Sequence, residues 1–415
     1  MRRVYPHGAG LDVHKKTVVA AYLTGYDEKG NEVFDTQTFP TMTKDLLQLG
    51  DWLSERGVTH VAMESTAEYW KPVYNILEDQ FELLVVNAHH VKHVPGRKTD
   101  QNDAQWLSLL MQHGLLSKSF IPAQGQRELR EMTRARAGMV RERTNLVNRL
   151  HKTLESANIK LASVATDLQG VSARAMLRAL IEGNTDASVM AQLARGRMRS
   201  KKEDLEAALT GRVKAHHRFI LAQLLSQIEG LEASISDFNQ EIERMCVPFE
   251  NAVSHLDTIP GIGVVAAQAL VGEIGTDMSP FPTDGHIAAW AGVAPGNYQS
   301  GGKTLSRRTR PGNHNLKRVL IEAAHAAVKV KDTYLAAQYH RLAGRRGKKR
   351  AIVAVAHSIL VIAYHLIKRD QDYQELGGNY FDMRQSVKTT QNLINRLQQL
   401  GYDVELNPRA EAIAA

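Results

Sequence analysis

The chain has 415 residues and a hydrophobic content of 43%, which allows two or three domains with real cores and excludes a disordered chain. Its one cysteine, Cys246, excludes an internal disulfide and a cysteine-based zinc site, and it suits a reducing cytosol. The net charge of +8 suits a polyanionic partner such as nucleic acid, because phosphate contacts release condensed counterions.

We expect neither a signal peptide nor a membrane span. Residues 1–10 are basic but lack the apolar run of a signal peptide. The longest apolar stretch, Ala351–Ile367, contains two histidines and is shorter than a bilayer-spanning helix. We therefore predict a buried helix in this stretch, and a cytoplasmic protein without a membrane partner.

Residues 1–120 alternate between strand and helix patterns. The predicted strands cover residues 10–23, 32–39, 59–63 and 81–87, and the predicted helices cover 42–56, a segment ending at Leu77, and about 99–113. Alternating elements of this kind indicate an α/β layer fold. Trp70 and Trp106 are expected in its core, because large aromatic side chains are commonly buried.

Four carboxylates stand at informative places in this pattern. Asp12 lies within the first strand, Glu64 follows the strand at 59–63, and Asp100 and Asp103 share one face at the start of a helix. In an RNase H-like fold these elements converge at one edge of the sheet. Carboxylate oxygens select Mg²⁺, with Mn²⁺ as the alternative, and two such ions can hold the attacking and leaving oxygens of a phosphodiester.

Each carboxylate also has a simpler interpretation. Glu64 could be a solvated charge at a strand end, and Asp100 and Asp103 could be helix caps. Asp12 is more informative, because strands are poor in aspartate and a buried aspartate needs a partner.

The loop before the last of these helices contains His89, His90 and His93. They could hold a metal ion, but a loop that faces solvent or nucleic acid suits them better. We assign Lys98, which follows them, to nucleic-acid binding.

Residues 125–245 lose the strand pattern and predict two long helices. A 3-4 spacing of apolar residues predicts a coiled-coil seam at Leu221, Leu224, Ile228, Leu231, Ile235, Phe238, Ile242 and Met245. A similar series from Leu129 to Leu154 has Arg136 and Arg143 at seam positions. The two helices could pair within one chain or between chains, and shorter helices are expected between them.

Pro248 ends the second long helix, and residues 251–370 form a new helical region with glycine-rich loops. Residues 256–275 resemble a helix-hairpin-helix, in which Gly261 and Gly263 let the backbone approach a phosphate. The alternative is an ordinary turn between two helices.

A glycine-rich loop further along contains Ser300, which is followed by four cations, Lys303, Arg307, Arg308 and Arg310. A hydroxyl beside glycines and fixed cations could attack phosphorus, with the cations stabilising the developing charge. From the residues alone, a plain loop serine is the alternative.

The stretch 341–350 is strongly basic, and we predict that it contacts RNA or DNA phosphates through Arg345, Arg346, Lys348 and Lys349. The tail after Gly377 is polar, with an amphipathic segment at Val387–Leu400.

Three blocks of the chain resemble the DEDD transposases of the insertion-sequence one-ten family: GLDVHKK, AMEST followed by YW, and KTDQNDAQWL. Residues 290–324 resemble the second conserved domain of the same enzymes. Ala67 departs from the glycine that is usual there, and Arg310-Pro311-Gly312-Asn313 departs mildly from a Lys-x-Gly-Asn/Asp block. The resemblance covers about residues 8–120 and 250–330.

The resemblance implies a RuvC-like (RNase H-like) domain at 1–122, a helical coiled-coil region at 123–250, a mostly helical serine transposase domain at 251–370 and a tail at 371–415. It implies a recombinase of bacteria or archaea, associated with the nucleoid, in which a structured bridge RNA pairs with target and donor DNA. Ser300 would form a phosphoserine link to DNA, with Ser306 as the fallback. The four carboxylates and Mg²⁺ would complete a site with the serine domain of another subunit, in dimers that assemble into a tetramer.

Three functions remain open from the residues. The first is a DNA recombinase with a covalent serine step. The second is a metal-dependent hydrolytic nuclease or Holliday-junction resolvase that uses only the carboxylates. The third is a non-catalytic, coiled-coil nucleic-acid-binding protein. The carboxylates separate the first two from the third, and Ser300 separates the first from the second.

Overall fold

The computed structural model describes residues 3–65, 67–87, 91, 103–296, 298–306, 309 and 311–406. The chain divides into two compact units, Met1–Ile121 and Pro122–Ala415, and each is described by itself.

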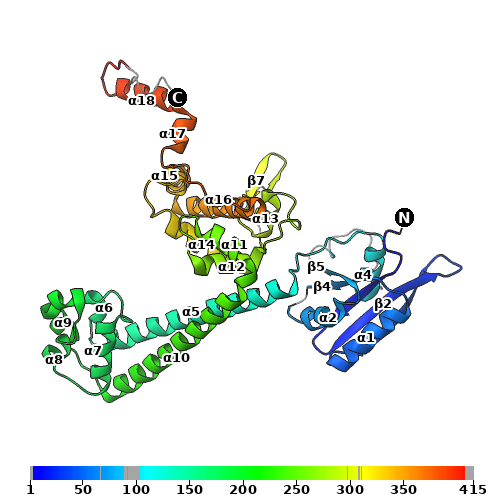
Figure 1. Cartoon of the computed structure of the whole chain (residues 1–415), viewed down its shortest axis with the longest axis horizontal. Helices are drawn as coiled ribbons and strands as arrows, with labels where there is room; N and C mark the ends of the chain where they lie inside the picture. The colour runs from blue at the N-terminus through cyan, green and yellow to red at the C-terminus, as the bar shows by residue number, and fades with distance from the viewer. Residues whose placement is uncertain are drawn as a thin grey trace. The chain divides into compact units, whose positions relative to one another are not determined.

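A five-stranded mixed sheet forms the centre of the first unit (Figure 1). Its order is β3-β2-β1-β4-β5, with β1, β2 and β3 antiparallel and β1, β4 and β5 parallel. The strands are β1 (Gly8–Val13), β2 (Thr17–Tyr26), β3 (Glu32–Pro40), β4 (His60–Glu64) and β5 (Glu82–Val86). This is the strand order of an RNase H-like fold, so the predicted α/β class is confirmed.

The sequence pattern predicts one strand over residues 10–23, and this prediction is wrong. The chain reverses direction within these residues and forms two strands, β1 and β2. The exposed residues His14, Lys15 and Lys16 form a tight turn, in which the His14 amide donates to the Thr17 carbonyl at 2.9 Å. The polar run interrupts the alternation of buried side chains, and two antiparallel strands result.

Helices cover both faces of the sheet. One face packs against α1 (Thr43–Glu55) and α2 (Trp70–Leu77), with Leu11, Leu53 and Leu77 in the shared core. The other face packs against α4 (Asp103–Gln112) through Leu107 and Trp106, which is 5% exposed. Trp70 is partly buried against the first core, so both tryptophans pack as predicted.

Two long antiparallel helices, α5 (Gln124–Ser156) and α10 (Ala215–Met245), lie side by side in the second unit (Figure 1). Leu221, Leu224 and Ile228 are buried at their interface, as the seam predicts. Arg143 donates to Glu232 at 2.8 and 2.7 Å. The structure therefore pairs the predicted coiled coil within one chain and matches a seam arginine with a carboxylate.

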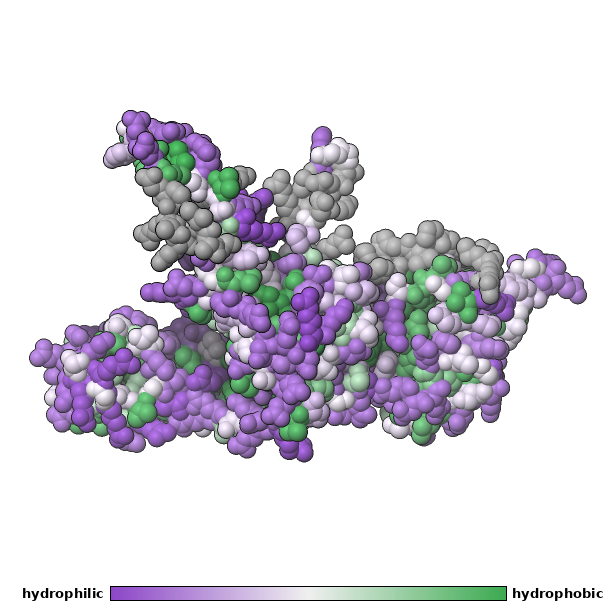
Figure 2. Space-filling model, turned by 45° about the horizontal axis from the view of Figure 1, so that its top comes forward, coloured by the Kyte–Doolittle hydropathy of each residue, from purple (hydrophilic) through white to green (hydrophobic). Residues whose placement is uncertain are grey.

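Short helices connect the far ends of this pair: α6 (Leu161–Val164), α7 (Val171–Ile181), α8 (Ala187–Ala191) and α9 (Lys202–Leu209). They share a core with the tips of α5 and α10 that includes Leu150, Leu177 and Leu205. The outer surface of this tip is mostly hydrophilic (Figure 2).

In the rest of the unit, α16 (Lys348–Arg369) packs against α11 (Glu250–Asp257), α13 (Asp284–Trp290), α14 (His314–Ala327) and α15 (Tyr334–Arg346). Val355, Ile359 and Ala363 of this helix are fully buried, which confirms the predicted buried helix. Within the described residues, α16 is the one helix long and apolar enough to cross a membrane, and half of its most apolar window is buried, as in a core helix. The other elements are α12 (Val264–Ile274), β6 (Tyr298–Ser300), β7 (Lys303–Ser306), α17 (Tyr380–Arg384) and α18 (Ser386–Gln399).

Candidate active site and nucleic-acid interface

Two of the predicted carboxylates lie at the carboxyl ends of neighbouring parallel strands. The register pairs Leu11 of β1 with Met63 of β4, so Asp12 and Glu64 follow at the next step of both strands. Side chains alternate between the faces of a sheet, and Leu11 faces α1 and α2. Asp12 and Glu64 therefore lie on the opposite face, beneath α4.

Helix α4 brings a third carboxylate to this corner. A Cβ at Gly10 would overlap the Ala104 carbonyl and lie 2.8 Å from the Leu107 Cβ, so only glycine allows the helix to lie so close to β1. The Ser108 hydroxyl donates to the Gly8 carbonyl at 3.1 Å. The helix thus runs antiparallel to β1, and its first residue, Asp103, lies over the end of the strand that carries Asp12.

The corner is chemically suited to a divalent cation. Asp12, Glu64 and Asp103 supply only carboxylate oxygens, which are the ligands that Mg²⁺ prefers. The side chain of Asp12 is 24% exposed and hydrogen-bonded to His14 Nε2 at 3.1 Å, a neighbour that the sequence patterns missed. No set of three His, Cys, Asp or Glu side chains is already arranged to hold a metal within the described ranges. Predicted residues outside those ranges are Asp100, Lys98, His89, His90 and His93.

The serine loop is a β-hairpin in the second unit. β6 and β7 pair antiparallel, with Ser300 opposite Lys303. The two residues between them, Gly301 and Gly302, have φ of +55° and +75°, a turn that glycine adopts at low cost. Ser300 therefore stands at the last strand position before the turn, and the exposed Lys303 stands at the first position after it.

The fallback residue, Ser306, lies at the other end of the hairpin, where it pairs with Tyr298. Arg307, Arg308 and Arg310 fall outside the described residues.

A buried carboxylate, Glu273, lies behind the segment that follows this hairpin. Its side chain accepts two hydrogen bonds from Arg134 of α5, at 2.7 and 2.8 Å, and one from the Asn313 amide at 2.6 Å. Asn313 also caps α14, because its side-chain oxygen accepts from the Asn315 and Leu316 amides. This network connects the long helix α5 with the start of α14.

Arg130 and Gly312 add further contacts between α5, α12, α13 and the start of α14. Arg130 of α5 donates to the Gly272 carbonyl at 3.1 Å and to the Glu273 carbonyl at 2.6 Å, and burial lowers the pKa of its guanidinium to about 10. A Cβ at Gly312 would lie 2.6 Å from the Trp290 carbonyl, so the backbone of this loop packs directly on the end of α13.

Our sequence interpretation missed this network. One signal in the sequence could have indicated it, since Glu273 is the only charged residue of α12.

The helix-hairpin-helix glycines have different surroundings. Gly261 has φ +88°, and a Cβ there would lie 2.5 Å from the Ala323 carbonyl of α14. Gly263 is the N-cap residue of α12, is exposed, and has open space where a Cβ would stand. Gly261 therefore has a packing reason to be glycine, whereas the outer side of the turn at Gly263 is open to a ligand.

The predicted basic stretch forms the junction of two helices. Arg345 and Arg346 end α15, and Lys348 and Lys349 begin α16, all of them exposed. Gly347 between them has φ +83°, which allows the sharp change of direction.

Comparisons with known proteins match both units. A family model described as transposase, of the IS110 DEDD type, matches residues 9–159, and the model of the transposase IS116/IS110/IS902 family matches residues 253–341. Together these models span more than half of the chain. The first range includes Asp12, Glu64 and Asp103, and the second includes Ser300.

Several curated proteins are similar to this chain, two of those named here over most of its length. The transposase for insertion sequence element IS1111A of Coxiella burnetii is 25% identical over 88% of this chain and 90% of its own length. A probable family 20 transposase of Pseudomonas aeruginosa is 26% identical over 79% of this chain and 89% of its own length. A pilin gene-inverting protein of Moraxella bovis is 28% identical over 42% of this chain and 61% of its own length.

Proposed function

Because the chain belongs to the IS110 family of DEDD transposases, an insertion-sequence family whose members cut and transfer DNA, we propose that it joins DNA through a phosphoserine at Ser300 and is guided by a structured RNA. The observation that carries this proposal is the hairpin. It presents a serine next to a two-glycine turn, directly opposite a lysine, in the range matched by the second family model. The corresponding coarser conclusion, a DNA-binding transposase, does not depend on that serine.

In the proposed reaction, Ser300 Oγ attacks the phosphorus of a DNA phosphodiester. The Oγ–P bond forms while the bond from phosphorus to one deoxyribose oxygen breaks, and that oxygen leaves as a hydroxyl. A deoxyribose hydroxyl of the second DNA later attacks the phosphoserine and regenerates the serine. Lys303 would stabilise the negative charge that develops on the phosphoryl oxygens, and Arg307, Arg308 and Arg310 are proposed to add to this.

The carboxylate corner would serve the same phosphate. Asp12, Glu64, Asp103 and, by proposal, Asp100 would hold Mg²⁺ or Mn²⁺. When bound, such an ion neutralises charge on the phosphoryl oxygens. The carboxylates themselves would fix the position of the cation relative to the sheet edge, because Asp12 and Glu64 are held by paired strands and Asp103 by α4.

We further propose that the two halves of this site come from different subunits. The carboxylates lie in the first compact unit and the serine hairpin in the second, so neither unit alone holds a complete site. Dimers would assemble into a tetramer around target and donor DNA, with the guide RNA pairing with both. The name of the Moraxella bovis relative, a gene-inverting protein, suits a reaction that rejoins what it cuts.

The decisive test is a denaturation-resistant protein–DNA adduct. The purified complex with its co-purifying RNA is incubated with DNA and Mg²⁺, and adducts are separated on a denaturing gel and mapped by mass spectrometry. We expect an adduct on the peptide containing Ser300, its loss in Ser300→Ala with RNA binding retained, and its persistence in Ser306→Ala. An adduct that persists in Ser300→Ala and disappears in Ser306→Ala would move the nucleophile.

The alternative is a hydrolytic nuclease or junction resolvase, which the RNase H-like carboxylate corner could support by itself. Free DNA ends produced by Ser300→Ala at the wild-type rate would favour it. Both proposed functions require Asp12, so Asp12→Ala is expected to remove cleavage that depends on a divalent ion, and unchanged cleavage would contradict the metal site.

Sequencing of the co-purifying RNA tests whether an RNA guides the enzyme. A discrete structured RNA would support guidance, and random cellular RNA would oppose it.

A further inference from the structure

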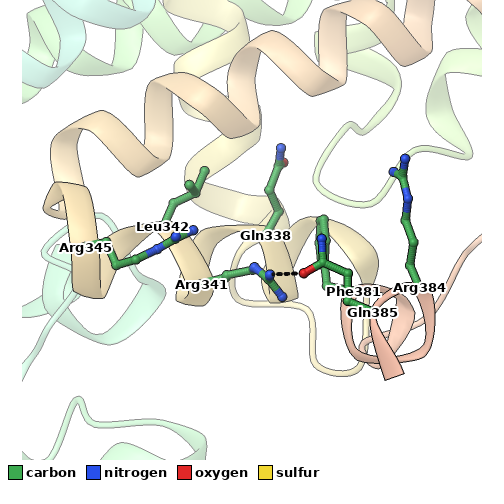
Figure 3. A pocket seen from close by; sticks show the side chains of 7 residues that line it. All are labelled: Gln338, Arg341, Leu342, Arg345, Phe381, Arg384 and Gln385. Atoms are coloured by element: carbon green, nitrogen blue, oxygen red, sulfur yellow. Dashed lines mark hydrogen bonds between the residues drawn. The ribbon is translucent and has the colours of Figure 1, made fainter. Parts of the chain in front are cut away.

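A cavity of about 400 Å³ between α15 and α17 is lined by three arginines (Figure 3). Arg341 and Arg345 stand one turn apart on the same side of α15, and Arg384, the last residue of α17, lines the cavity from that helix. Gln338 and Gln385 add amide groups to the wall, and no carboxylate lines the cavity. Every polar side chain around it can therefore donate a hydrogen bond.

Side-chain contacts hold the short helix α17 against α15, so the wall of the cavity is fixed by packing within the protein. The rings of Phe381 and Tyr334 stack with centroids 5.2 Å apart, and the guanidinium of Arg341 lies 5.5 Å from the Phe381 centroid. Arg341 also donates to Gln385 Oε1 at 3.1 Å (Figure 3). Arg341 is thus held at the cavity wall before any ligand arrives.

These three arginines lack the carboxylate partners that arginines of the same chain have elsewhere. Arg134, Arg143 and Arg178, for example, each donate to a glutamate at 2.8 Å or less. Within the described part of the chain, no Asp or Glu lies within ion-pair distance of the three cavity arginines. Three like charges around one cavity repel one another, and a bound anion would offset that repulsion.

A second, larger groove shares two wall residues with this cavity. Gln338 and Leu342 line both, and the second groove, of about 1060 Å³, adds the cations Arg346, Lys349 and Arg350. Its far wall includes Pro295 and Thr309, which flank the hairpin that carries Ser300. Cations therefore line both the α15–α17 cavity and the groove that reaches the segments on either side of the serine hairpin.

We propose that this cavity binds the phosphodiester backbone of a single nucleic-acid strand, which then follows the groove to the serine hairpin. The guanidinium fork matches phosphate oxygens in geometry as well as charge. The cavity has the size of a small-molecule site, so it admits one nucleotide of a strand and excludes a duplex. This inference depends on the proposed function in one respect: it takes the bound polyanion to be a nucleic acid.

The test measures how salt weakens the binding of a single strand by the full-length protein. Fluorescence anisotropy is recorded in EDTA with DNA and RNA oligonucleotides of one sequence, for wild type and for a triple variant (Arg341→Gln, Arg345→Gln, Arg384→Gln). Each lost phosphate contact lowers the slope of log K against log salt by about 0.7, so the triple variant is expected to lose about 2 from the slope. Its affinity at about 0.1 M salt is expected to fall at least tenfold.

A matched control removes the same charge elsewhere. Arg195, Arg197 and Arg199 are exposed at the tip formed by α6–α9, and their triple glutamine variant changes the net charge equally. The control is expected to keep the wild-type slope within about 0.7, one contact. A third variant with lysine at 341, 345 and 384 keeps the charges but loses the fork, and it should keep the slope while binding more weakly. Thermal melts check that all variants are folded.

The outcomes separate the two sources of phosphate. If the triple variant has a lower salt slope than wild type with RNA only, the cavity binds an RNA strand. If the slope is lower with DNA only, the cavity binds a DNA strand, and if it is lower with both, the cavity accepts either strand. An unchanged slope, or equal losses in the two triple glutamine variants, would overturn the proposal. Because the assay contains no divalent ion and needs no covalent step, its failure is distinct from a missing Ser300 adduct.

Discussion

Glu273 is the one acidic side chain that is buried in the part of the chain that the structure describes, at 2% exposure. A buried carboxylate is costly unless hydrogen bonds and opposite charge compensate for the loss of water. Here Arg134 and Asn313 use both oxygens, and Arg130 lies 3.7 Å from one of them. The side chain is therefore satisfied, but only while all its partners stay in place.

Glu273→Gln should destabilise the second unit by about 3 kcal/mol, because it leaves arginine charge partly buried without its counter-charge. Urea denaturation followed by circular dichroism measures this. Glu241→Gln is the control, since the Glu241 side chain is 41% exposed and its ion pair is with Arg244 one turn away, and we expect no measurable change. Equal effects of the two substitutions would show that the buried network is not a stabilising element.

Gly261 and Gly263 offer a matched pair, separated by one residue. Gly261→Ala forces a Cβ into the α14 backbone at a positive φ, and we expect it to cost about 2–3 kcal/mol. Gly263→Ala places its Cβ in open space at φ −110°, so it should cost only the weaker N-cap preference of alanine, about 0.5–1 kcal/mol. Thermal melts of both variants decide this. If Gly263→Ala were the more destabilising of the two, the assignment of Gly261 to packing would be wrong.

At the scale of elements, His255 fastens the end of α16 to α11. Its ring nitrogens bond to Asp372 at 2.7 Å and to Asp370 at 3.0 Å. The next residue along the segment, Tyr373, donates its amide to Thr258 of the same turn at 2.9 Å. The segment that leads to α17 is thereby held against the helix-hairpin-helix region.

This attachment should weaken as pH rises. The hydrogen bond to Asp372, aided by Asp370, raises the pKa of His255 above 6.5 against the opposing effect of burial. A raised folded-state pKa contributes stability that is complete below the unfolded pKa of about 6.5 and is lost as pH rises through the folded value. Hydrogen exchange at the Tyr373 amide, corrected for intrinsic pH dependence, should therefore accelerate above neutral pH.

His255→Gln should remove this pH dependence of exchange at Tyr373. The matched control is His325→Gln on α14, where the histidine is exposed, and it should retain the wild-type profile. A His255→Gln profile identical to wild type would show that another group controls the segment.

Local patterns in the sequence predicted most of the elements. Apolar residues repeat every two residues in a half-buried strand and every three to four residues in a helix, so both are recognisable from the sequence. Asp12 and Glu64 could be placed at one edge because parallel strands end together. The network at Glu273 could not be predicted, because its partners on α5 are 139 and 143 residues away and no periodicity relates them. The cavity beside α17 also depends on a contact between two helices that are separated in the sequence. The basic stretch 341–350 therefore indicated Arg341 and Arg345, but no pattern in the sequence indicated that Arg384 lines the same cavity.

At the scale of the whole molecule, the chain keeps its carboxylates and its serine in separate compact units. If the two halves act on one phosphate, as we propose, cutting would require the correct assembly to form first, which suits an enzyme that must keep broken ends together. Each unit is held by its own core, so a substitution at one half should leave the other half intact.

This division predicts complementation between two inactive variants. Asp12→Asn lacks a carboxylate but keeps Ser300, and Ser300→Ala lacks the proposed nucleophile but keeps the carboxylates. If the site forms between subunits, a mixed assembly contains intact pairings of one protomer's carboxylates with another protomer's serine, and strand transfer should return to a substantial fraction of wild type. The measurement is recombination product from co-expressed, differently tagged variants that are purified through both tags. Each variant alone, and a mixture of Asp12→Asn with a double variant that also lacks Ser300, should stay inactive. Mixed assemblies without activity would place both halves of the site in one subunit, because every protomer present would then contain a defective half.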